Sequence, residues 1–228
     1  MKPPILGIET TTDTLSVALV QEGRAITEIF QRGKNIHDEM LHVFVTQILD
    51  NQRLRVHELG GIAVSEGPGS FTGLRIGMSY AKGIAYSAKI PLACVPTMDG
   101  IAHSVAYSNF LKAGEEFAIV FDARREDVYV ALYRMRAEGF ERIIPAYADT
   151  VEHVIHKLSD DTFLLGDGAD KIVTRTGNKY RRISGELAES HAISIALLGE
   201  KMIEEGKLAD IAQCEPNYVK DFFSTMKI

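Results

Sequence analysis

Tryptophan is absent from the 228-residue sequence, and cysteine occurs only twice, at Cys94 and Cys214. The two cysteines form no CxxC pattern, which indicates reduced, structural thiols rather than a disulfide framework or a zinc site. No apolar run approaches the length of a membrane span, and residues 1–4 lead into a strand-like segment without a signal-peptide pattern. We therefore expect a cytoplasmic protein that does not enter a membrane.

An excess of positive charge is also lacking, because 25 Lys and Arg stand against 31 Asp and Glu, for a net charge of −6. A protein that grips a nucleic-acid backbone alone usually presents a basic face. Any role with nucleic acid is therefore expected to depend on a partner. The chain is long enough for one large domain or for two lobes of roughly 110 residues, each able to bury a core.

A faint internal repeat supports the second arrangement. Residues 8–19 can be laid over residues 121–132, an offset of 113. Each copy has an apolar residue, a carboxylate (Glu9 or Asp122), a polar turn and a Val-Ala-Leu strand. Two unrelated hairpins would give a similar pattern. The position of each copy near the start of one half of the chain favours two related lobes.

Hydrophobic spacing predicts the elements of both halves. In the first half we expect strands at 5–8, 15–21, 25–31, 61–65 and 91–95, and helices at 36–50, 70–88 and 97–104, the last two capped by Ser70 and Thr97. In the second half we expect strands at 117–122, 128–135, 140–146 and 163–166, a helix at 151–158 and helices after residue 190. This order predicts an α/β protein with one mixed sheet and packed helices in each lobe. The lobes are placed at 1–104 and 105–228, with the final helices able to pack back on the first lobe.

The predicted helix at 70–88 is apolar nearly all round, since its only charges are Arg75 and Lys82. Such a helix is covered on more than one side. The two lobes of the chain could cover it, but an apolar surface of this size favours a subunit interface. Glycine and alanine recur every four residues on this helix, so another backbone can approach closely. The interface candidates, with the helix at 36–50 beside it, are Met40, Leu41, Phe44, Gly73, Ile76, Gly77, Tyr80 and Ile84.

A Gly-Pro-Gly turn precedes this helix, within the run Ser-Glu-Gly-Pro-Gly-Ser-Phe-Thr-Gly-Leu-Arg-Ile-Gly at residues 65–77. A strand, a glycine turn and a helix N-terminus together can form an anion pocket. The run lacks the Gly-Lys-Ser/Thr ending of a Walker A loop, so no lysine reaches a phosphate. A tight structural turn is the simpler interpretation.

Four segments of the chain resemble the bacterial TsaB (YeaZ) family: residues 6–13, 16–19, 67–77, and 121–125 followed by 128–130. The resemblance implies two related lobes of the actin/Hsp70/sugar-kinase (ribonuclease H-like) type. It also implies a non-catalytic scaffold subunit that works beside its catalytic paralogue TsaD and the ATPase TsaE. Together these attach a threonylcarbamoyl group to the adenosine next to the anticodon of tRNA. We expect a homodimer when the chain is alone, and tRNA contact only through the complex.

The resemblance also bears on catalysis, because the catalytic relatives hold a metal with a His-x-x-x-His pair on a helix. The corresponding positions here are Thr97 and Ile101, and isoleucine cannot bind a metal. His103 lies nearby but alone. We expect no catalytic residues, no metal and no cofactor. The absence of His-Glu-x-x-His and Gly-x-Ser-x-Gly patterns makes a metalloprotease or serine hydrolase the weakest alternative.

A stand-alone nucleotide hydrolase or small-molecule kinase of the same fold is the main alternative. Kinases of this fold open each lobe with a carboxylate followed by a glycine-rich phosphate turn. Glu9 and Asp122 supply the carboxylates here, but neither following turn contains glycine. The weak phosphate candidates are Thr10, Thr11 and Ser70. We expect Glu9 and Asp122 to tie down their hairpin turns or to reach across the cleft between the lobes.

Overall fold

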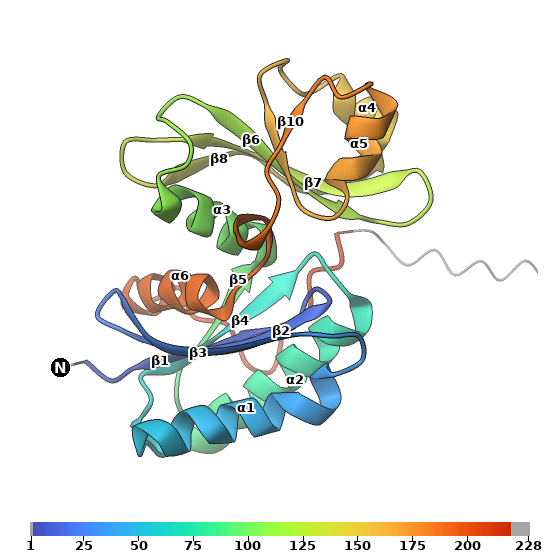
Figure 1. Ribbon diagram of the computed structural model, residues 1–228. Helices are drawn as coiled ribbons and strands as arrows, with labels where there is room; N and C mark the ends of the chain where they lie inside the picture. The colour runs from blue at the N-terminus through green and yellow to red at the C-terminus, as the bar shows by residue number, and fades with distance from the viewer. Residues whose placement is uncertain (1, 220–228) are drawn as a thin grey trace, which may run out of the picture.

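The computed structural model describes residues 2–219 and shows two lobes, each built on a five-stranded sheet (Figure 1). The first sheet has the strand order β3-β2-β1-β4-β5. Its strands are β1 (Ile5–Glu9), β2 (Thr14–Gln21), β3 (Arg24–Arg32), β4 (Gly61–Gly67) and β5 (Leu92–Pro96). Strands β1, β2 and β3 form an antiparallel meander, whereas β4 and β5 add to β1 in parallel.

The second sheet has the order β10-β9-β6-β7-β8. Its strands are β6 (Glu116–Asp122), β7 (Asp127–Met135), β8 (Phe140–Thr150), β9 (Phe163–Leu165) and β10 (Arg181–Arg182). In the reverse direction the order is β8-β7-β6-β9-β10, which matches the order of the first sheet strand for strand. Strands β6, β7 and β8 form an antiparallel meander, and β9 and β10 add to β6 in parallel. The two lobes therefore share one topology, and the predicted repeat falls on the hairpins β1–β2 and β6–β7.

The register of the two hairpins differs by one residue. Glu9 pairs with Ser16 in the first hairpin, so an offset of 113 would pair Asp122 with residue 129. Asp122 pairs with Val128 instead. The second hairpin turn is therefore one residue shorter than the first, a difference that letter-by-letter comparison of the repeat does not show.

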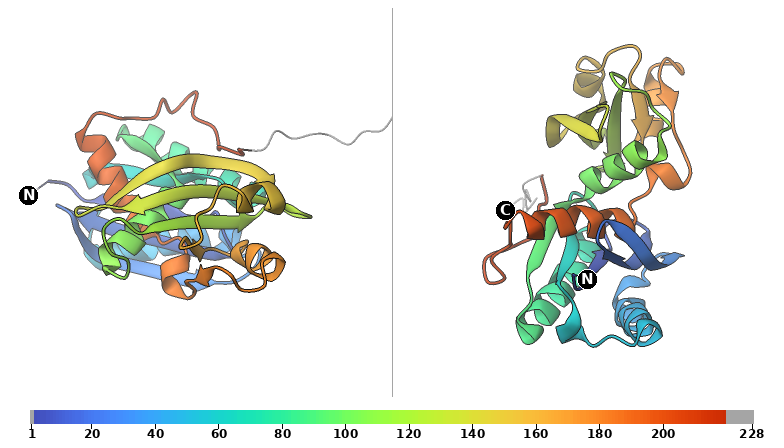
Figure 2. Two further views of the ribbon diagram at one scale, coloured as in Figure 1. Left: turned by 90° about the horizontal axis from the view of Figure 1, so that it is seen from above. Right: turned by 90° about the vertical axis from the view of Figure 1, so that its left-hand side faces the viewer.

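Helices cover both faces of each sheet, as the views in Figures 1 and 2 show. The helices are α1 (His37–Gln52), α2 (Phe71–Ala88), α3 (Thr97–Ser108), α4 (Val151–Ile155), α5 (Ala169–Arg175) and α6 (Ala192–Glu204), with one-turn 3₁₀ helices at Val56–Glu58 and Glu186–Ala188. Helices α1 and α2 pack on the outer face of the first sheet, and α6 packs on its inner face. Helix α3 packs on the inner face of the second sheet, and α4 and α5 pack on its outer face.

Two helices pack against the sheet of the other half of the chain, taking residue 104 as the boundary between the halves. Helix α3 follows β5 of the first sheet, but its Ile101 and Val105 are buried against the second sheet. Helix α6 belongs to the second half of the chain, but its Ile195 and Ala196 are buried against the first sheet. The polypeptide thus exchanges one helix in each direction between the lobes.

Several predicted boundaries were wrong. Helix α3 extends to Ser108, and its N-cap is Pro96 rather than Thr97. Helix α4 ends at Ile155, and β8 continues to Thr150. The short elements α5 and β10 were not predicted. The cap at Ser70 is confirmed, because its hydroxyl accepts a hydrogen bond from the Gly73 N–H.

After α6 the chain returns along the edge of the first sheet as an irregular segment, residues 207–219, which we call the strap. Its Ala209 N–H donates to the Leu92 carbonyl at 2.8 Å, and its Asn217 N–H donates to the Glu66 carbonyl at 2.7 Å. The strap is therefore tied to the start of β5 and to the end of the neighbouring strand β4. Among residues 2–219, no helix combines the length and apolar character that a membrane crossing requires.

Candidate functional site

The turn between β1 and β2 is organised by Glu9, which is fully buried. One carboxylate oxygen accepts hydrogen bonds from the N–H and the hydroxyl of Thr11, both at 2.5 Å. The other accepts a hydrogen bond from the Ser190 hydroxyl at 2.6 Å. Burial raises the pKa of Glu9, although these three hydrogen bonds oppose the change. Glu9 thus ties down its own turn and attaches the segment before α6 to it.

The three hydroxyls considered for phosphate binding are all engaged within the chain. The Thr10 hydroxyl donates to the Gly73 carbonyl at 2.8 Å, and the Thr11 hydroxyl donates to Glu9. The Ser70 hydroxyl caps α2. The first hairpin turn also packs directly on α2, since a Cβ atom added at Gly73 would lie 1.9 Å from the Thr10 carbonyl oxygen. The glycine stripe of α2 therefore accommodates a backbone of the same chain.

The corresponding turn of the second lobe is organised by an ion pair. The Lys171 ammonium from α5 donates to the Asp122 carboxylate at 2.6 Å and to the carbonyls of Arg125 and Asp127 at 2.8 and 3.1 Å. Desolvation acts to raise the pKa of Asp122, but the hydrogen bonds from Lys171 and the Arg124 N–H outweigh it and lower this pKa. Asp122 therefore also ties its own turn rather than reaching across to the first lobe.

Two arginines hold this turn in a conformation that favours glycine. Arg124 and Arg125 have φ angles of 68° and 52°, in the left-handed region. The backbone therefore bends as a glycine-containing turn would, but it carries two long side chains. The ammonium of Lys171 lies inside this turn and binds its carbonyls and Asp122.

The two positions that the resemblance places opposite metal ligands, Thr97 and Ile101, serve the interior of this chain. The Thr97 hydroxyl accepts a hydrogen bond from the Gly67 N–H at 3.1 Å and so fixes the glycine turn before α2. Ile101 is fully buried. His103 lies 3.3 Å from the Ser194 hydroxyl, and burial lowers its pKa. Between residues 2 and 219, no three His, Cys, Asp or Glu side chains gather to hold a metal ion.

The surface formed by α1 and α2 contains fewer exposed apolar groups than the sequence indicates. Leu41 and Phe44 are buried in the core of the first lobe, as are Gly73 and Gly77. These four candidates therefore face the interior. The candidates that remain partly accessible are Met40, Ile76, Tyr80 and Ile84. Val43 of α1, 38% exposed and absent from the candidate set, adds to this outer surface.

The strap covers the remaining side of α2 and uses its two charges. Arg75 Nε donates to the Tyr218 hydroxyl at 2.9 Å, and the Arg75 guanidinium lies 3.8 Å from the centre of the Phe71 ring. Lys82 Nζ donates to the Cys214 carbonyl at 2.9 Å. The narrow charged face of α2 is therefore a binding site for the chain's own C-terminal segment. No motif or spacing in the sequence indicates these contacts.

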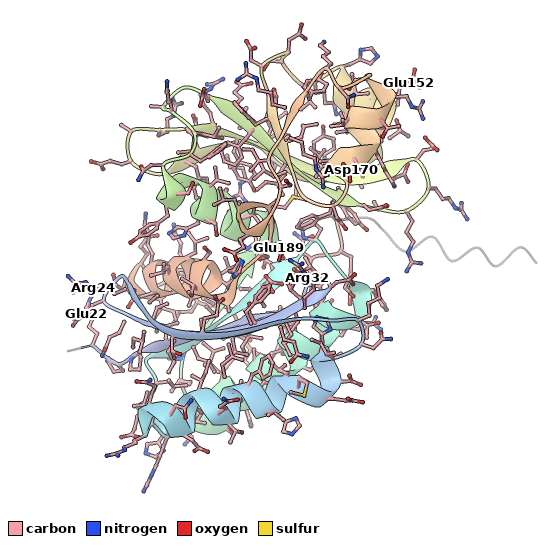
Figure 3. The ribbon with its side chains drawn as sticks, viewed as in Figure 1. Glu22, Arg24, Arg32, Glu152, Asp170 and Glu189 are labelled. Carbon is pink, nitrogen blue, oxygen red and sulfur yellow. The ribbon has the colours of Figure 1, made fainter. Side chains whose placement is uncertain are left out.

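The junction between the lobes carries further ion pairs. Figure 3 shows Arg32 of β3 and Glu189, which precedes α6, close together between the lobes, and the two side chains form an ion pair. Arg142 of β8 donates to the Asp99 carboxylate of α3. The Asp99 charge also acts on Glu66 of β4: burial, with this nearby charge, raises the pKa of Glu66 to about 7.

Comparison with known proteins agrees with this architecture. A family model described as "TsaD: tRNA N6-adenosine threonylcarbamoyltransferase" matches residues 31–212. The Bacillus subtilis tRNA threonylcarbamoyladenosine biosynthesis protein TsaB is 33% identical over 228 residues, covering 95% of this chain and 93% of that protein. The chain belongs to the TsaB (YeaZ) family. The solved structure of YeaZ from Pseudomonas aeruginosa has a TM-score of 0.79 and 25% identity, covering 95% of this chain and 99% of that one.

The TsaB assignment confirms the family and the two-lobed fold class expected from the sequence. A tRNA N6-adenosine threonylcarbamoyltransferase of Fervidobacterium nodosum is also 32% identical over 193 residues, covering 77% of this chain and 52% of that protein. TsaB-type and TsaD-type chains are therefore related in sequence. This relation agrees with the TsaD model matching the chain.

Proposed function

We propose that this chain is the non-catalytic partner subunit of a TsaD-type tRNA threonylcarbamoyltransferase. The observation that carries the proposal is that the candidate catalytic and phosphate-binding positions are engaged within the chain itself. Thr97 and Ile101 support the interior, and the turns at Glu9 and Asp122 are closed by the chain's own groups. The TsaB relatives are named for tRNA threonylcarbamoyladenosine biosynthesis, which supports a role in that modification. The TsaD-type relatives are named as the transferase, which supports TsaD as the catalytic partner.

The partner would bind the outer surface of α1 and α2. Met40, Ile76, Tyr80 and Ile84 are apolar or aromatic and only partly covered by the chain, which suits a subunit contact. The strap occupies the opposite side of α2, so this surface faces away from it. An isologous dimer would use the same surface on each copy. Homodimer formation and TsaD binding are therefore proposed to compete.

The proposal includes the ATPase TsaE as a third component and tRNA as a substrate that the complex, rather than this chain alone, binds. The net charge of −6 supports the second point, because phosphate binding requires basic surface. Since tRNA is modified in the cytoplasm, the proposal places the chain there. The turns at Glu9 and Asp122 give no support to a stand-alone kinase or nucleotide hydrolase.

Reconstitution tests the function. TsaD and TsaE of the same host are mixed with tRNA, ATP and threonylcarbamoyl-adenylate, with and without this chain, and the modified nucleoside is measured by mass spectrometry. We expect modification only when the chain is present, and no ATP hydrolysis or modification by the chain alone. Modification at the full rate without the chain would contradict the proposal.

A charge substitution tests the surface. Ile76→Asp should remove TsaD binding and tRNA modification together, because a partner would bury an unpaired carboxylate, a loss of about 3 kcal/mol or more. Val43→Asp tests the same surface at a more exposed position. Tyr107→Asp is the control, since Tyr107 of α3 is 78% exposed and lies outside α1 and α2. If both variants fold and still bind TsaD as the control does, the surface is elsewhere.

A further inference from the structure

The only two cysteines of the chain are brought together by the fold. Cys94 lies in β5 and Cys214 in the strap, 120 positions later in the sequence. Both side chains are half-buried free thiols that pack against the core of the first lobe. The Cys94 sulfur lies 3.9 Å from the Met78 sulfur, and Met78 and Cys214 line the same cavity, so Met78 is a neighbour of both cysteines.

Hydrogen bonds on both sides hold the two segments beside each other. The Ala209–Leu92 bond fixes the strap at the start of β5, and the Asn217–Glu66 bond fixes it at the end of the neighbouring strand β4, where Gly67 pairs with Pro96 of β5. Cys94 and Cys214 each lie between these two points. A disulfide requires the two Cα atoms within about 7 Å, so only segments that run side by side can form one. The strap lies beside β5, which is the arrangement that a disulfide between Cys94 and Cys214 needs.

The surroundings give the two thiols different roles. A cavity of about 270 Å³ opens between α2 and the strap, and its lining includes Met78, Lys82 and Cys214 but not Cys94. A small oxidant entering this cavity would therefore meet Cys214. Burial, together with the neighbouring Cys214, raises the pKa of Cys94 to about 12, so the Cys94 thiol is protected from direct oxidation.

Lys82 supplies positive charge to the same place. Its ammonium donates to the Cys214 carbonyl at 2.9 Å, and its charge opposes the rise in the pKa of Cys94. Lys82 is therefore a positioning residue for this pair, since it holds the strap that carries Cys214.

We propose that Cys94 and Cys214 form a reversible disulfide that fastens the strap to the first lobe. The Cys214 thiolate attacks a peroxide oxygen, the O–O bond breaks, and hydroxide leaves and takes up a proton, giving a sulfenic acid and water. The Cys94 sulfur then attacks the Cys214 sulfur, an S–S bond forms, and the sulfenic hydroxyl leaves as a second water with the Cys94 proton. Two thiols are oxidised and one peroxide is reduced, and an external thiol reverses the process.

The consequence of the bond is a restrained C-terminal segment. The strap is held by backbone hydrogen bonds and by contacts to Arg75 and Lys82. The disulfide would add a covalent link that closes a long loop and removes freedom from the unfolded chain. We therefore expect oxidation to protect strap amides from hydrogen exchange and to raise the thermal midpoint by roughly 5–10 °C.

Peptide mapping of the full chain tests the proposal. The protein is treated with hydrogen peroxide, alkylated and digested without reductant. The expected product is one peptide pair joined through Cys94 and Cys214, lighter by two hydrogen atoms and separated by dithiothreitol. A Cys214 sulfinic acid beside a free Cys94 thiol, or a cross-link between two copies, would overturn the proposal.

Variants separate the disulfide from other effects of peroxide. Cys214→Ser, in the irregular strap, and Cys94→Ser should each abolish the rise in thermal midpoint and the protection of residues 209–217. Lys82→Met should slow cross-linking by roughly 3- to 10-fold, whereas Lys34→Met, an exposed lysine before α1, should leave the rate unchanged. A peroxide-induced rise in thermal midpoint that persists in Cys214→Ser would contradict the assignment, as would equal rates for the two lysine variants.

Discussion

The two hairpin turns of this chain occupy equivalent places in two lobes of the same topology, but they are held in opposite ways. Thr10 and Thr11 of the β1–β2 turn are buried, and the Glu9 carboxylate is enclosed by hydroxyls and an N–H group. The β6–β7 turn is exposed, and its carboxylate is neutralised by the ammonium of Lys171. One turn depends on packing and the other on charge.

The neighbouring helix explains the difference. In the first lobe α2 lies directly on the turn, because Gly73 and Gly77 leave room for Thr10. In the second lobe the shorter helix α5 extends Lys171 into the turn instead. In both lobes the polar groups of the turn are engaged within the chain. Equivalent turns of one topology are thus held by two physical routes.

The largest expected effect concerns the packing of the first turn. Gly73→Ala should destabilise the protein by about 4 kcal/mol or more, since the new Cβ would overlap the Thr10 carbonyl oxygen. Gly83→Ala is the matched control on the same helix, because nothing lies within 4 Å of a Cβ there. The control should gain about 0.5–1 kcal/mol from helix propensity. Urea denaturation measures both, and equal effects would show that the close approach is not required.

The next effect compares the two carboxylates. Glu9→Ala should cost about 3 kcal/mol, because it leaves the Thr11 N–H and the Ser190 hydroxyl without their acceptor in a buried place. Asp122→Ala should cost less than about 1 kcal/mol, since its ion pair is partly exposed. The difference in the free energy of unfolding between these two variants is the measurement. A larger loss for Asp122→Ala would reverse the comparison between the lobes.

The pH dependence should also differ in sign between the turns. Burial raises the pKa of Glu9 above its ordinary 4.5, so the folded state keeps this proton longer and the contribution of Glu9 falls as pH rises above 4.5. Asp122 has a pKa below its ordinary 3.8, because the hydrogen bonds it accepts outweigh desolvation. Its contribution is present above pH 3.8 and is lost as pH falls through the folded value.

Unfolding of Glu9→Gln, Asp122→Asn and the unmodified chain, compared from about pH 3 to about pH 8, checks these signs. The stability difference between the unmodified chain and Glu9→Gln should shrink as pH rises. The difference for Asp122→Asn should shrink as pH falls toward the acid end of the range. Parallel curves for both variants would show that neither carboxylate titrates differently in the folded state.

Sequence reasoning reached the architecture because it rests on local signals. The repeat located both hairpins, and the serine before the apolar run at 71–88 located the N-cap of α2. Element ends were less accurate, and α5 was missed because seven residues give too little periodic signal. The one-residue difference between the turns was invisible because it leaves the strand pattern intact.

The candidate surface was only partly predictable for a different reason. Helical spacing groups Leu41 and Phe44 with Met40, but it does not reveal which side of α1 the sheet covers. The glycine stripe of α2 was correctly interpreted as a site of close backbone approach, but the approaching backbone is Thr10. Contacts of the strap, such as Arg75 with Tyr218 over 143 positions, have no periodic signature at all.

The smallest expected effect tests whether the second turn could be reopened. Arg124→Gly with Arg125→Gly removes two side chains from left-handed positions and should stabilise the fold by roughly 1 kcal/mol in total. ATP hydrolysis should stay at the buffer rate, because Lys171 still occupies the turn and Thr10 and Thr11 remain engaged in the first lobe. Calorimetric unfolding and a phosphate-release assay measure the two outcomes on the same preparation. Arg181→Gly is the control for loss of an arginine elsewhere in the second lobe, since Arg181 lies in the exposed strand β10. ATP turnover by the double variant but not by the control would show that the two arginines alone close the site. The β6–β7 turn would then not depend on Lys171 to exclude phosphate.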